Sequence, residues 1–372
     1  AAYGGVMTAP LTLPTSTIPD PAEAPGLRWG VIAPGGIARN SIGTMHAATA
    51  SRLVAVCSRS RERARVFARD FESDAGLATA YADVDEFLAH EGLEAVYVAS
   101  PHAQHFALAK QVLEAGIPVV IEKPMTLNAE QARELFALGH EKGAYVQEAM
   151  WSCFMPHYDV IRQVIESGAI GEVTGVIAEH CQYFPFDPEH RLYAPELGGG
   201  ALLDLGVYPL AFAHWVAGSP EKIHATGTLT ATGVDEMISI SGLRDRTVYA
   251  VQTGLGARGE VGAHVLGTRG KIDVDSWFFV PNSFTVTQFE AGERGEDLRM
   301  RFTYEDSLPY ELPRHPEGGN FGMAFEIAEA ARNIRAGRLE SERWGAGDTL
   351  AVLEVMDRVR EAIGVRYPGE EK

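Results

Sequence analysis

Between residues 27 and 149, short apolar runs recur and are separated by segments long enough to form helices. Five runs have the length and composition of buried strands: Leu27–Ala33, Leu53–Ser58, Ala95–Ala99, Val119–Glu122 and Tyr145–Glu148. Parallel strands need crossover connections of helix length, and strands buried on both faces read as continuous apolar runs. Phe106–Gly116 and Ala129–Lys142 are the clearest crossovers, and Asn128 with Gln131 is a good N-cap signal for the second. The pattern predicts an α/β domain with a doubly wound parallel sheet.

The first apolar run leads into a glycine-rich turn, Pro34-Gly35-Gly36, and a helix is expected from about Ile37. Glycines between a strand and a helix let the backbone approach a pyrophosphate, which the free N–H groups at the helix N-terminus can bind. Ala33 stands where this motif has its first glycine. We expect Ala33, Gly35, Gly36 and Ile37 to bind a dinucleotide, and a tight turn without a ligand is the alternative.

The end of the second run bears on the choice of nucleotide. It reads Cys57-Ser58-Arg59-Ser60, and no Asp or Glu occurs between Ala47 and Arg61. An NAD site usually has an acidic residue here for the ribose hydroxyls, whereas an arginine suits a 2′-phosphate. Ser58 and Arg59 are therefore predicted to bind NADP, with NAD less favoured. The alternative for Arg59 is a solvated residue at the start of a helix.

The third run continues into Ser100-Pro101-His102-Ala103-Gln104-His105. Two histidines three residues apart can bind a metal, but no carboxylate or thiol with ligand spacing accompanies them, so no metal site is predicted. We expect Ser100, Pro101 and His102 to lie near the reactive end of the nucleotide and His105 to cap the next helix.

The fourth run stops at Glu122-Lys123-Pro124, which fixes a cation at the C-terminal end of a parallel strand. Open α/β sheets bind ligands at that edge. Proline restricts the backbone conformation of the preceding residue and lowers the energy of a cis peptide bond. The Lys123–Pro124 bond is therefore a candidate for a rigid element that orients the Lys123 side chain. The alternative is a solvated lysine in an ordinary loop.

After Trp151 the pattern changes, which predicts a second domain over residues 151–372, preceded by an arm (1–26) and a nucleotide-binding domain (27–150). Between Lys222 and Tyr304, several extended runs without helix-length separators predict a large, mainly antiparallel open sheet. An apolar helix is expected from Ala201 to about Val216, and spacing of four places Asp204 and Tyr208 on one face of it. Helices at about Asn320–Ala336 and Gly347–Ile363 complete an α+β domain.

The amino-acid composition limits the classes of molecule that the chain is expected to bind. The formal net charge of -18 over 372 residues argues against nucleic acid and anionic membranes, which attract concentrated Lys and Arg. Three scattered cysteines favour a reducing compartment, hence the cytoplasm, and no apolar run approaches a membrane span. The arm has five prolines before Gly26, and we expect it to pack on a neighbouring subunit or over the nucleotide site.

Together, Glu122-Lys123-Pro124 and the stretch from Gly199 to Tyr208 resemble the Gfo/Idh/MocA family of NAD(P)-dependent oxidoreductases, over Leu27 to about Pro368. Glu148-Ala149-Met150-Trp151 and the ending Ala362–Pro368 are most similar to its dimeric dihydrodiol dehydrogenase and NADP-dependent xylose dehydrogenase branch. The resemblance implies a Rossmann domain and catalytic roles for Lys123, Asp204 and Tyr208. Cys153 and His180 depart from the branch pattern and are expected to line the substrate pocket.

The implied reaction is hydride transfer between NADP and a secondary alcohol or hemiacetal of a sugar, polyol or cyclic trans-diol. Tyr208 is the candidate base, activated by Lys123, and Asp204 would orient Lys123; alternatively Lys123 itself carries the proton. Trp151 and Trp277 would form an apolar wall for the substrate unless they are core residues. Trp151, Glu122, Lys123 and His105 are also expected to contact the cofactor.

An antiparallel sheet with one open face predicts a homodimer or a dimer of dimers. A catalytically silent nucleotide-binding sensor and a lyase or hydrolase with transient use of bound NAD are the other functions considered.

Overall fold

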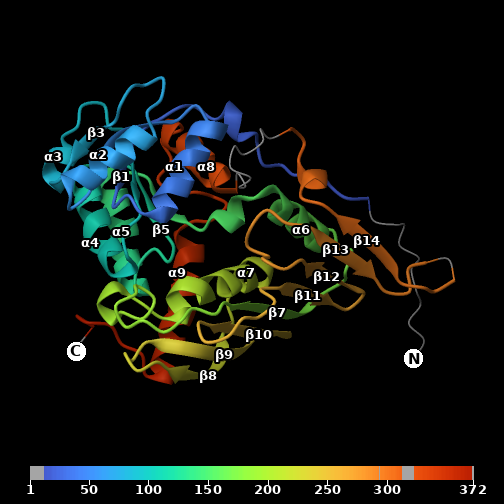
Figure 1. Cartoon of the computed structure of the whole chain (residues 1–372). Helices are drawn as coiled ribbons and strands as arrows, with labels where there is room; N and C mark the ends of the chain where they lie inside the picture. The colour runs from blue at the N-terminus through green and yellow to red at the C-terminus, as the bar shows by residue number, and fades with distance from the viewer. Residues whose placement is uncertain (1–11, 293, 312–321, 371–372) are drawn as a thin grey trace.

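The computed structural model describes residues 12–292, 294–311 and 322–370. The first sheet has six parallel strands in the order β3-β2-β1-β4-β5-β6. They are β1 (Arg28–Ile32), β2 (Arg52–Cys57), β3 (Thr79–Tyr81), β4 (Ala95–Val98), β5 (Val119–Glu122) and β6 (Val146–Ala149). The helices that connect them are α1 (Gly36–Ala48), α2 (Arg61–Asp70), α3 (Val84–Leu88), α4 (His102–Glu114) and α5 (Ala129–Lys142) (Figure 1). The predicted doubly wound sheet is confirmed.

Local signals explain the best-predicted helix. The side chain of Asn128 accepts a hydrogen bond from the Gln131 N–H at the start of α5, and Gly143 ends the helix at φ 66°. Glycine adopts this left-handed conformation at little cost, which makes it the common residue just past a helix end. The bounds of α5 therefore coincide with those predicted.

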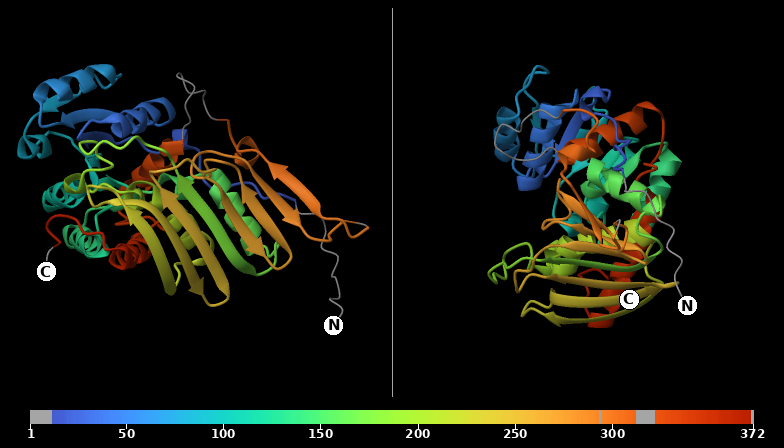
Figure 2. Two further views of the ribbon diagram at one scale, coloured as in Figure 1. Left: turned by 60° about the horizontal axis from the view of Figure 1, so that its bottom comes forward. Right: turned by 90° about the vertical axis from the view of Figure 1, so that its right-hand side faces the viewer.

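The second sheet has eight strands in the order β14-β13-β12-β11-β7-β10-β9-β8 (Figure 2). They are β7 (Val173–Cys181), β8 (Lys222–Leu229), β9 (Asp235–Arg244), β10 (Thr247–Gly254), β11 (Ala263–Gly267), β12 (Gly270–Val274), β13 (Phe284–Gln288) and β14 (Leu298–Phe302). Only the β7–β10 pairing is parallel among these described strands. The predicted, mainly antiparallel sheet is confirmed, and with it the fold class.

Helices of the C-terminal half pack on both sheets. The helix α7 (Val207–Ala217) covers β7 and β10, and α9 (Ala346–Ile363) contacts both β8 and α5. The helix α8 (Gly322–Arg335) packs on α1 instead, and its Ile327 and Ala330 join the buried cluster of the first sheet. Residues far along the chain thus complete the core of the first sheet, and the division at residue 150 stays a prediction. Asn320, the expected start of this helix, lies outside the described residues.

One segment tests the expectation that no apolar run approaches membrane-spanning length. Pro195–Ala217 has 23 residues, and its most apolar 18-residue window has a mean hydropathy of 1.2, so the segment is long and apolar enough by composition. However, 83% of its most apolar window is buried within the fold, as in the core helix of a globular domain. Its apolarity is weak evidence for a span.

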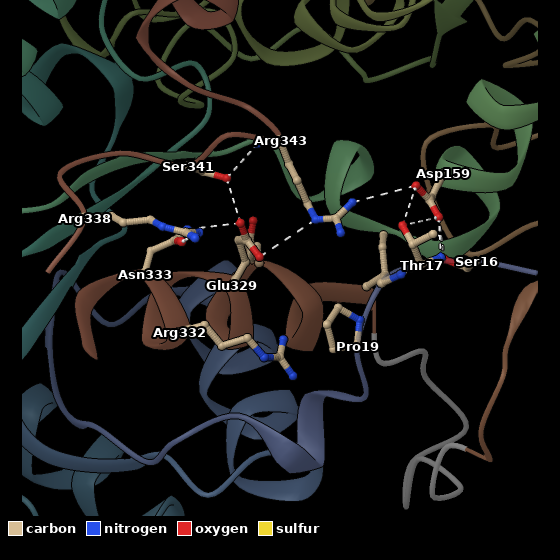
Figure 3. Close-up of polar contacts among 12 residues, drawn as sticks. Ser16, Thr17, Pro19, Asp159, Glu329, Arg332, Asn333, Arg338, Ser341 and Arg343 are labelled. Carbon is tan, nitrogen blue, oxygen red and sulfur yellow. Dashed lines mark hydrogen bonds and ion pairs between the residues drawn. The ribbon is translucent and has the colours of Figure 1, made fainter. Parts of the chain in front are cut away.

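The N-terminal arm is tied to its own chain in the part that the structure describes. The Ser16 hydroxyl and the Thr17 N–H donate to Asp159 Oδ2 at 3.0 and 2.6 Å, and Ile18 is buried (Figure 3). Asp159 belongs to α6 (Pro156–Glu166), and Arg332 of α8 donates to the Asp20 carbonyl. Residues 12–26 therefore fasten α6 to α8, and none of them lines the cleft described below. For these residues the expected position over the nucleotide site is wrong, whereas packing on a neighbouring subunit stays a prediction. Residues 1–11 lie outside the described residues.

Replacing Asp159 by Ala should lower the free energy of unfolding by about 1–3 kcal/mol, because it leaves several donors of the arm without their acceptor. Denaturant unfolding measures this change in free energy. In limited proteolysis, the variant should be cleaved within the first 26 residues sooner than the wild type. Glu166→Ala, an exposed carboxylate on the same helix, is the control. An Asp159→Ala protein as stable and as protease-resistant as the wild type would show that the arm is not held through this residue.

Candidate active site

A cleft of about 1310 Å³ lies along the C-terminal ends of β1, β2, β4 and β5, and residues of β7 and α7 form its other wall. Most of the predicted site residues line it: Ala33, Gly35, Gly36, Ile37, Ser58, Arg59, Ser100, Pro101, His102, His105, Glu122, Lys123, His180, Asp204 and Tyr208. Trp151, Trp277 and Cys153 do not line it. The edge at which parallel sheets bind ligands is therefore where the predicted residues converge.

At one end, the turn before α1 leaves space for a ligand. A Cβ atom added at Gly36 would meet no atom within 4 Å, and at Gly35 the nearest atom would be 3.9 Å away. No side chain caps the N-terminus of α1, so its first N–H groups are open to an anion. Ala33 has φ 64°, a conformation that glycine adopts with less strain. Ala33 therefore replaces the first glycine of the motif while its backbone keeps the conformation that a glycine would adopt.

The end of β2 supplies the cations of this half of the cleft. Ser58, Arg59 and Ser60 line it directly after the strand, and Arg63 reaches it from the first turn of α2. Arg63 was not predicted, because it lies four residues past Arg59 on a helix that the sequence patterns did not locate. With no carboxylate among the lining residues here, this end suits a phosphate.

The two histidines of α4 are both buried but differ in their surroundings. His105 lies within the helix with Nδ1 2.9 Å from the Pro124 carbonyl and Nε2 2.8 Å from the Ser100 carbonyl, so it joins two loops of the site. The N-cap position belongs to Pro101, so the prediction that His105 caps the helix is wrong. His102 Nε2 lies 3.7 Å from Asp204 Oδ1, and burial lowers the pKa of His102 to about 3. His102 is therefore neutral at physiological pH.

Lys123 follows β5 directly, and the Lys123–Pro124 peptide bond is cis. Its Nζ donates a 2.6 Å hydrogen bond to the Asp204 carbonyl, lies 3.6 Å from Asp204 Oδ1 and sits 4.6 Å from the centre of the Tyr208 ring. The preceding carboxylate, Glu122, accepts a hydrogen bond from the buried Tyr97 hydroxyl. Burial alone would lower the pKa of Lys123, but Tyr208, Asp204 and Glu122 together raise it above its ordinary value. The ammonium is thus fixed in position and charged.

Tyr208 lies at the start of α7 and is stacked on Phe279 with ring centres 4.3 Å apart. The Trp151 Nε1–H donates to its hydroxyl at 3.2 Å. Burial raises the pKa of Tyr208, and the Lys123 ammonium only partly offsets this. Lys123 therefore favours the phenolate, as expected, but burial outweighs its effect, so the net pKa is raised and the phenol keeps its proton at neutral pH.

Asp204 lies in a turn of π-helix, Leu202–Gly206, which runs directly into α7. The predicted shared face is confirmed, since Asp204 and Tyr208 both contact Lys123. Arg191 donates to Asp204 Oδ1 and Oδ2 at 2.9 and 3.3 Å. Burial alone would raise the pKa of Asp204, but Lys123 and Arg191 hold it well below its usual range. Asp204 is therefore a carboxylate shared by two cations.

The aromatic residues of the site differ from the prediction. Trp151 is buried behind Tyr208, where it orients the hydroxyl, and Trp277 is 40% exposed outside the cleft. Phe279 lines the cleft instead and stacks on both Tyr208 and His180. His180 lines the cleft as predicted, whereas Cys153 is buried elsewhere. No sequence signal separated Phe279 from its neighbours Trp277 and Phe278, because the three occupy an irregular loop.

Comparison with known proteins agrees with this geometry. Residues 27–150 match the model of the oxidoreductase family with an NAD-binding Rossmann fold, and residues 158–273 match the GFO/IDH/MocA C-terminal domain. Trans-1,2-dihydrobenzene-1,2-diol dehydrogenase of Mus musculus is 30% identical, covering 93% of this chain and 99% of that protein. The NADP(+) D-xylose 1-dehydrogenase of Hypocrea jecorina is 32% identical, covering 92% and 93% respectively.

Solved structures have the same fold. A complex of levoglucosan dehydrogenase with NADH and levoglucosan has a TM-score of 0.78 at 18% identity, covering 91% of this chain and 98% of that one. With two family models that together span more than half of the chain, and relatives matched over nearly their whole length, the chain belongs to the Gfo/Idh/MocA family of NAD(P)-binding oxidoreductases.

Proposed function

We propose that this protein is an NADP-dependent dehydrogenase that interconverts a secondary alcohol or hemiacetal of a sugar, polyol or cyclic trans-diol with the corresponding carbonyl compound. The observation that carries the proposal is the meeting of Lys123, Asp204 and Tyr208 at one end of a cleft whose other end holds Ser58 and Arg59. The names of the relatives, a trans-diol dehydrogenase and a xylose dehydrogenase, support this substrate class.

The residues present fit a dinucleotide. The open space at Gly35 and Gly36 and the uncapped start of α1 would hold the pyrophosphate, and Arg59 with Arg63 would hold a 2′-phosphate. When bound, NADP supplies or accepts the hydride. Ser100, Pro101 and His102 line the cleft between these groups and Lys123, where they would position the nicotinamide.

The chain's own residues handle the oxygen and its proton. The Lys123 ammonium and the Tyr208 phenol are both protonated donors at neutral pH, so either can hydrogen-bond the substrate oxygen and give a proton to it during carbonyl reduction. Alcohol oxidation needs the reverse: the neutral amine of Lys123 or the phenolate of Tyr208 must accept the hydroxyl proton. Asp204 orients Lys123 through its carbonyl oxygen, and Trp151 orients the Tyr208 hydroxyl.

The two directions should therefore differ in pH dependence. Because the pKa values of Lys123 and Tyr208 are both raised, kcat/KM for alcohol oxidation should increase by about tenfold per pH unit between about pH 7 and 10. Carbonyl reduction uses the protonated forms and should be flat over the same range. Initial rates at the absorbance band of the reduced nicotinamide measure both. A plateau of the oxidation rate that already begins near pH 7 would contradict the protonated ground state.

The same absorbance assay tests the function itself. Purified protein is offered NADP or NAD with aldoses, inositols, anhydro-sugars and cyclic trans-diols, and we expect reduction of NADP with at least one class. Silence across this panel, with NADP binding intact by calorimetry, would contradict the proposal and favour a nucleotide-binding sensor. Conversion of a substrate without net reduction of the cofactor would favour a lyase or hydrolase.

We also propose that the protein forms a homodimer or a dimer of dimers through the second sheet. While α7 covers β7 and β10 on one face, Ile177 and Val248 on the other face are 43% and 55% exposed. Val248 pairs with Leu243, and Ile177 pairs with Ala250 two residues along, so the three apolar side chains share this face. A monomer by light scattering at micromolar concentration would contradict the proposal.

A cytoplasmic location completes the proposal. Cys57, Cys153 and Cys181 are all buried thiols outside any disulfide, as is usual for proteins of a reducing compartment.

A further inference from the structure

Arg191 is the cleft cation that neither the motif pattern nor the proposed proton chemistry uses. It lies in the loop between β7 and the short helix Pro195–Leu197, and it lines the cleft with a side chain that is 50% exposed. Its partner Asp204 is only 9% exposed. Through this ion pair, the loop contributes one side chain, the half-exposed guanidinium of Arg191, to the end of the cleft that contains Asp204.

Two of the five N–H groups of Arg191 are bound to Asp204, one from each terminal nitrogen. The remaining three have no acceptor among the described residues. Because guanidinium donors lie in one rigid plane, fixing two of them on Asp204 also fixes the directions of the other three. Arg191 thus presents oriented donors that a ligand oxygen can bind.

The position of these donors relative to Lys123 limits what the ligand can be. Arg191 Nη1 and Lys123 Nζ approach the same oxygen, Asp204 Oδ1, at 2.9 and 3.6 Å. The two nitrogens therefore lie close enough together that two oxygens on neighbouring carbons of one molecule can each accept a hydrogen bond from one of them. An oxygen on the carbon next to the reacting carbon would gain a charge-assisted hydrogen bond from Arg191, whereas a CH₂ group there would offer these donors no acceptor.

We propose that Arg191 is a specificity-determining residue that binds the oxygen on the carbon next to the reacting carbon. The site would then select 1,2-diols and 2-hydroxy hemiacetals over isolated alcohols. This inference rests on the proposed dehydrogenase function and narrows its substrate class. Asp204 has a double part in it, since it orients Lys123 toward the first oxygen and Arg191 toward the second.

The test compares matched substrates that differ in one oxygen: trans-cyclohexane-1,2-diol with cyclohexanol, and D-xylose with its 2-deoxy analogue. Values of kcat/KM with NADP are measured for the wild type, Arg191→Met and Arg191→Lys. Where turnover of the analogue is too slow, its inhibition constant is measured instead. Arg133→Met is the matched control, because Arg133 is also a half-exposed arginine on a carboxylate, Glu354, but lies outside the cleft.

We expect Arg191→Met to lower kcat/KM by about 10- to 100-fold for the substrate that carries the neighbouring oxygen. For the analogue that lacks this oxygen, kcat/KM should change by less than about threefold. Arg191→Lys keeps the charge without the rigid fork and should fall between the two, which keeps the test decisive if the Met variant does not fold. Arg133→Met should match the wild type.

Equal losses on both members of a pair would overturn the proposal and make Arg191 a support for Asp204 only. An unchanged preference for the vicinal substrate would overturn it as well. Failure of the proposed function looks different, because the wild type itself would then be silent with NADP on every class of the panel, before any variant is compared.

Discussion

Replacing Lys123 by Met should lower kcat/KM by at least about 10³-fold in both directions, because the variant loses the cation on the substrate oxygen together with a proton carrier. The structure gives the physical reason for so large an effect. Lys123 Nζ is held by the Asp204 carbonyl, the Asp204 carboxylate and the face of the Tyr208 ring, so the charge is fixed before the substrate arrives. In the Met variant, a water molecule or a free cation could not replace this ammonium, because neither would be held in a fixed position.

The binding of NADP should change little in Lys123→Met, because the phosphate-binding end of the cleft does not involve this residue. Calorimetry with NADP and a thermal unfolding curve establish that the variant is folded. Lys110→Met on α4 is the control: Lys110 is a partly exposed lysine paired with Glu134 outside the cleft. Turnover of Lys123→Met within tenfold of the wild type would contradict a role for this ammonium in the reaction.

Tyr208→Phe separates the two possible proton carriers in the same assay. If the phenol gives and takes the proton, the Phe variant should lose turnover nearly as completely as Lys123→Met. If Lys123 is the carrier, the variant should stay near normal, because the stacking on Phe279 needs only the ring. The Tyr208 hydroxyl would then have no essential part in the reaction.

The sequence was sufficient where a local rule decides the structure. Asn128 and Gly143 set the ends of α5, and the short apolar runs of the first sheet, separated by helix-length segments, are typical of parallel strands buried on both faces. The spacing of Asp204 and Tyr208 predicted their shared face, although the turn that contains Asp204 is a π-helix. The position of Lys123 followed from the end of its strand, since the carboxyl ends of parallel strands lie at one edge.

What the sequence could not predict depends on contacts between distant segments. Arg191 and Phe279 lie in loops without periodicity, so only the fold shows that they reach Asp204 and Tyr208. The ionisation of Tyr208 depends on its burial, which outweighs the charge of Lys123, and no sequence pattern indicates how deeply the side chain is buried. The same holds for α8, which follows the second sheet in sequence but packs with α1.

Replacing Arg59 and Arg63 together by Ala should lower kcat/KM for NADP by about 10²- to 10³-fold, since each removes a charge-assisted contact with the 2′-phosphate. The value for NAD should change by less than about threefold, because NAD has no charged group at that position. Both side chains are exposed at the cleft, so their loss leaves the packing of the first sheet intact. The measurement is the ratio of kcat/KM for the two nucleotides with one substrate.

Arg61→Ala is the control that distinguishes specific binding of the 2′-phosphate from a general effect of positive charge. Arg61 lies between the two arginines in sequence and is also exposed, but it pairs with Glu86 and does not line the cleft. A general loss of positive charge near the site would affect all three positions alike, and it would fade with added salt. Specific binding of the 2′-phosphate requires that Arg61→Ala retain the wild-type ratio. If Arg59→Ala,Arg63→Ala also retained the wild-type ratio, the end of β2 would not be the nucleotide-selecting element of this protein.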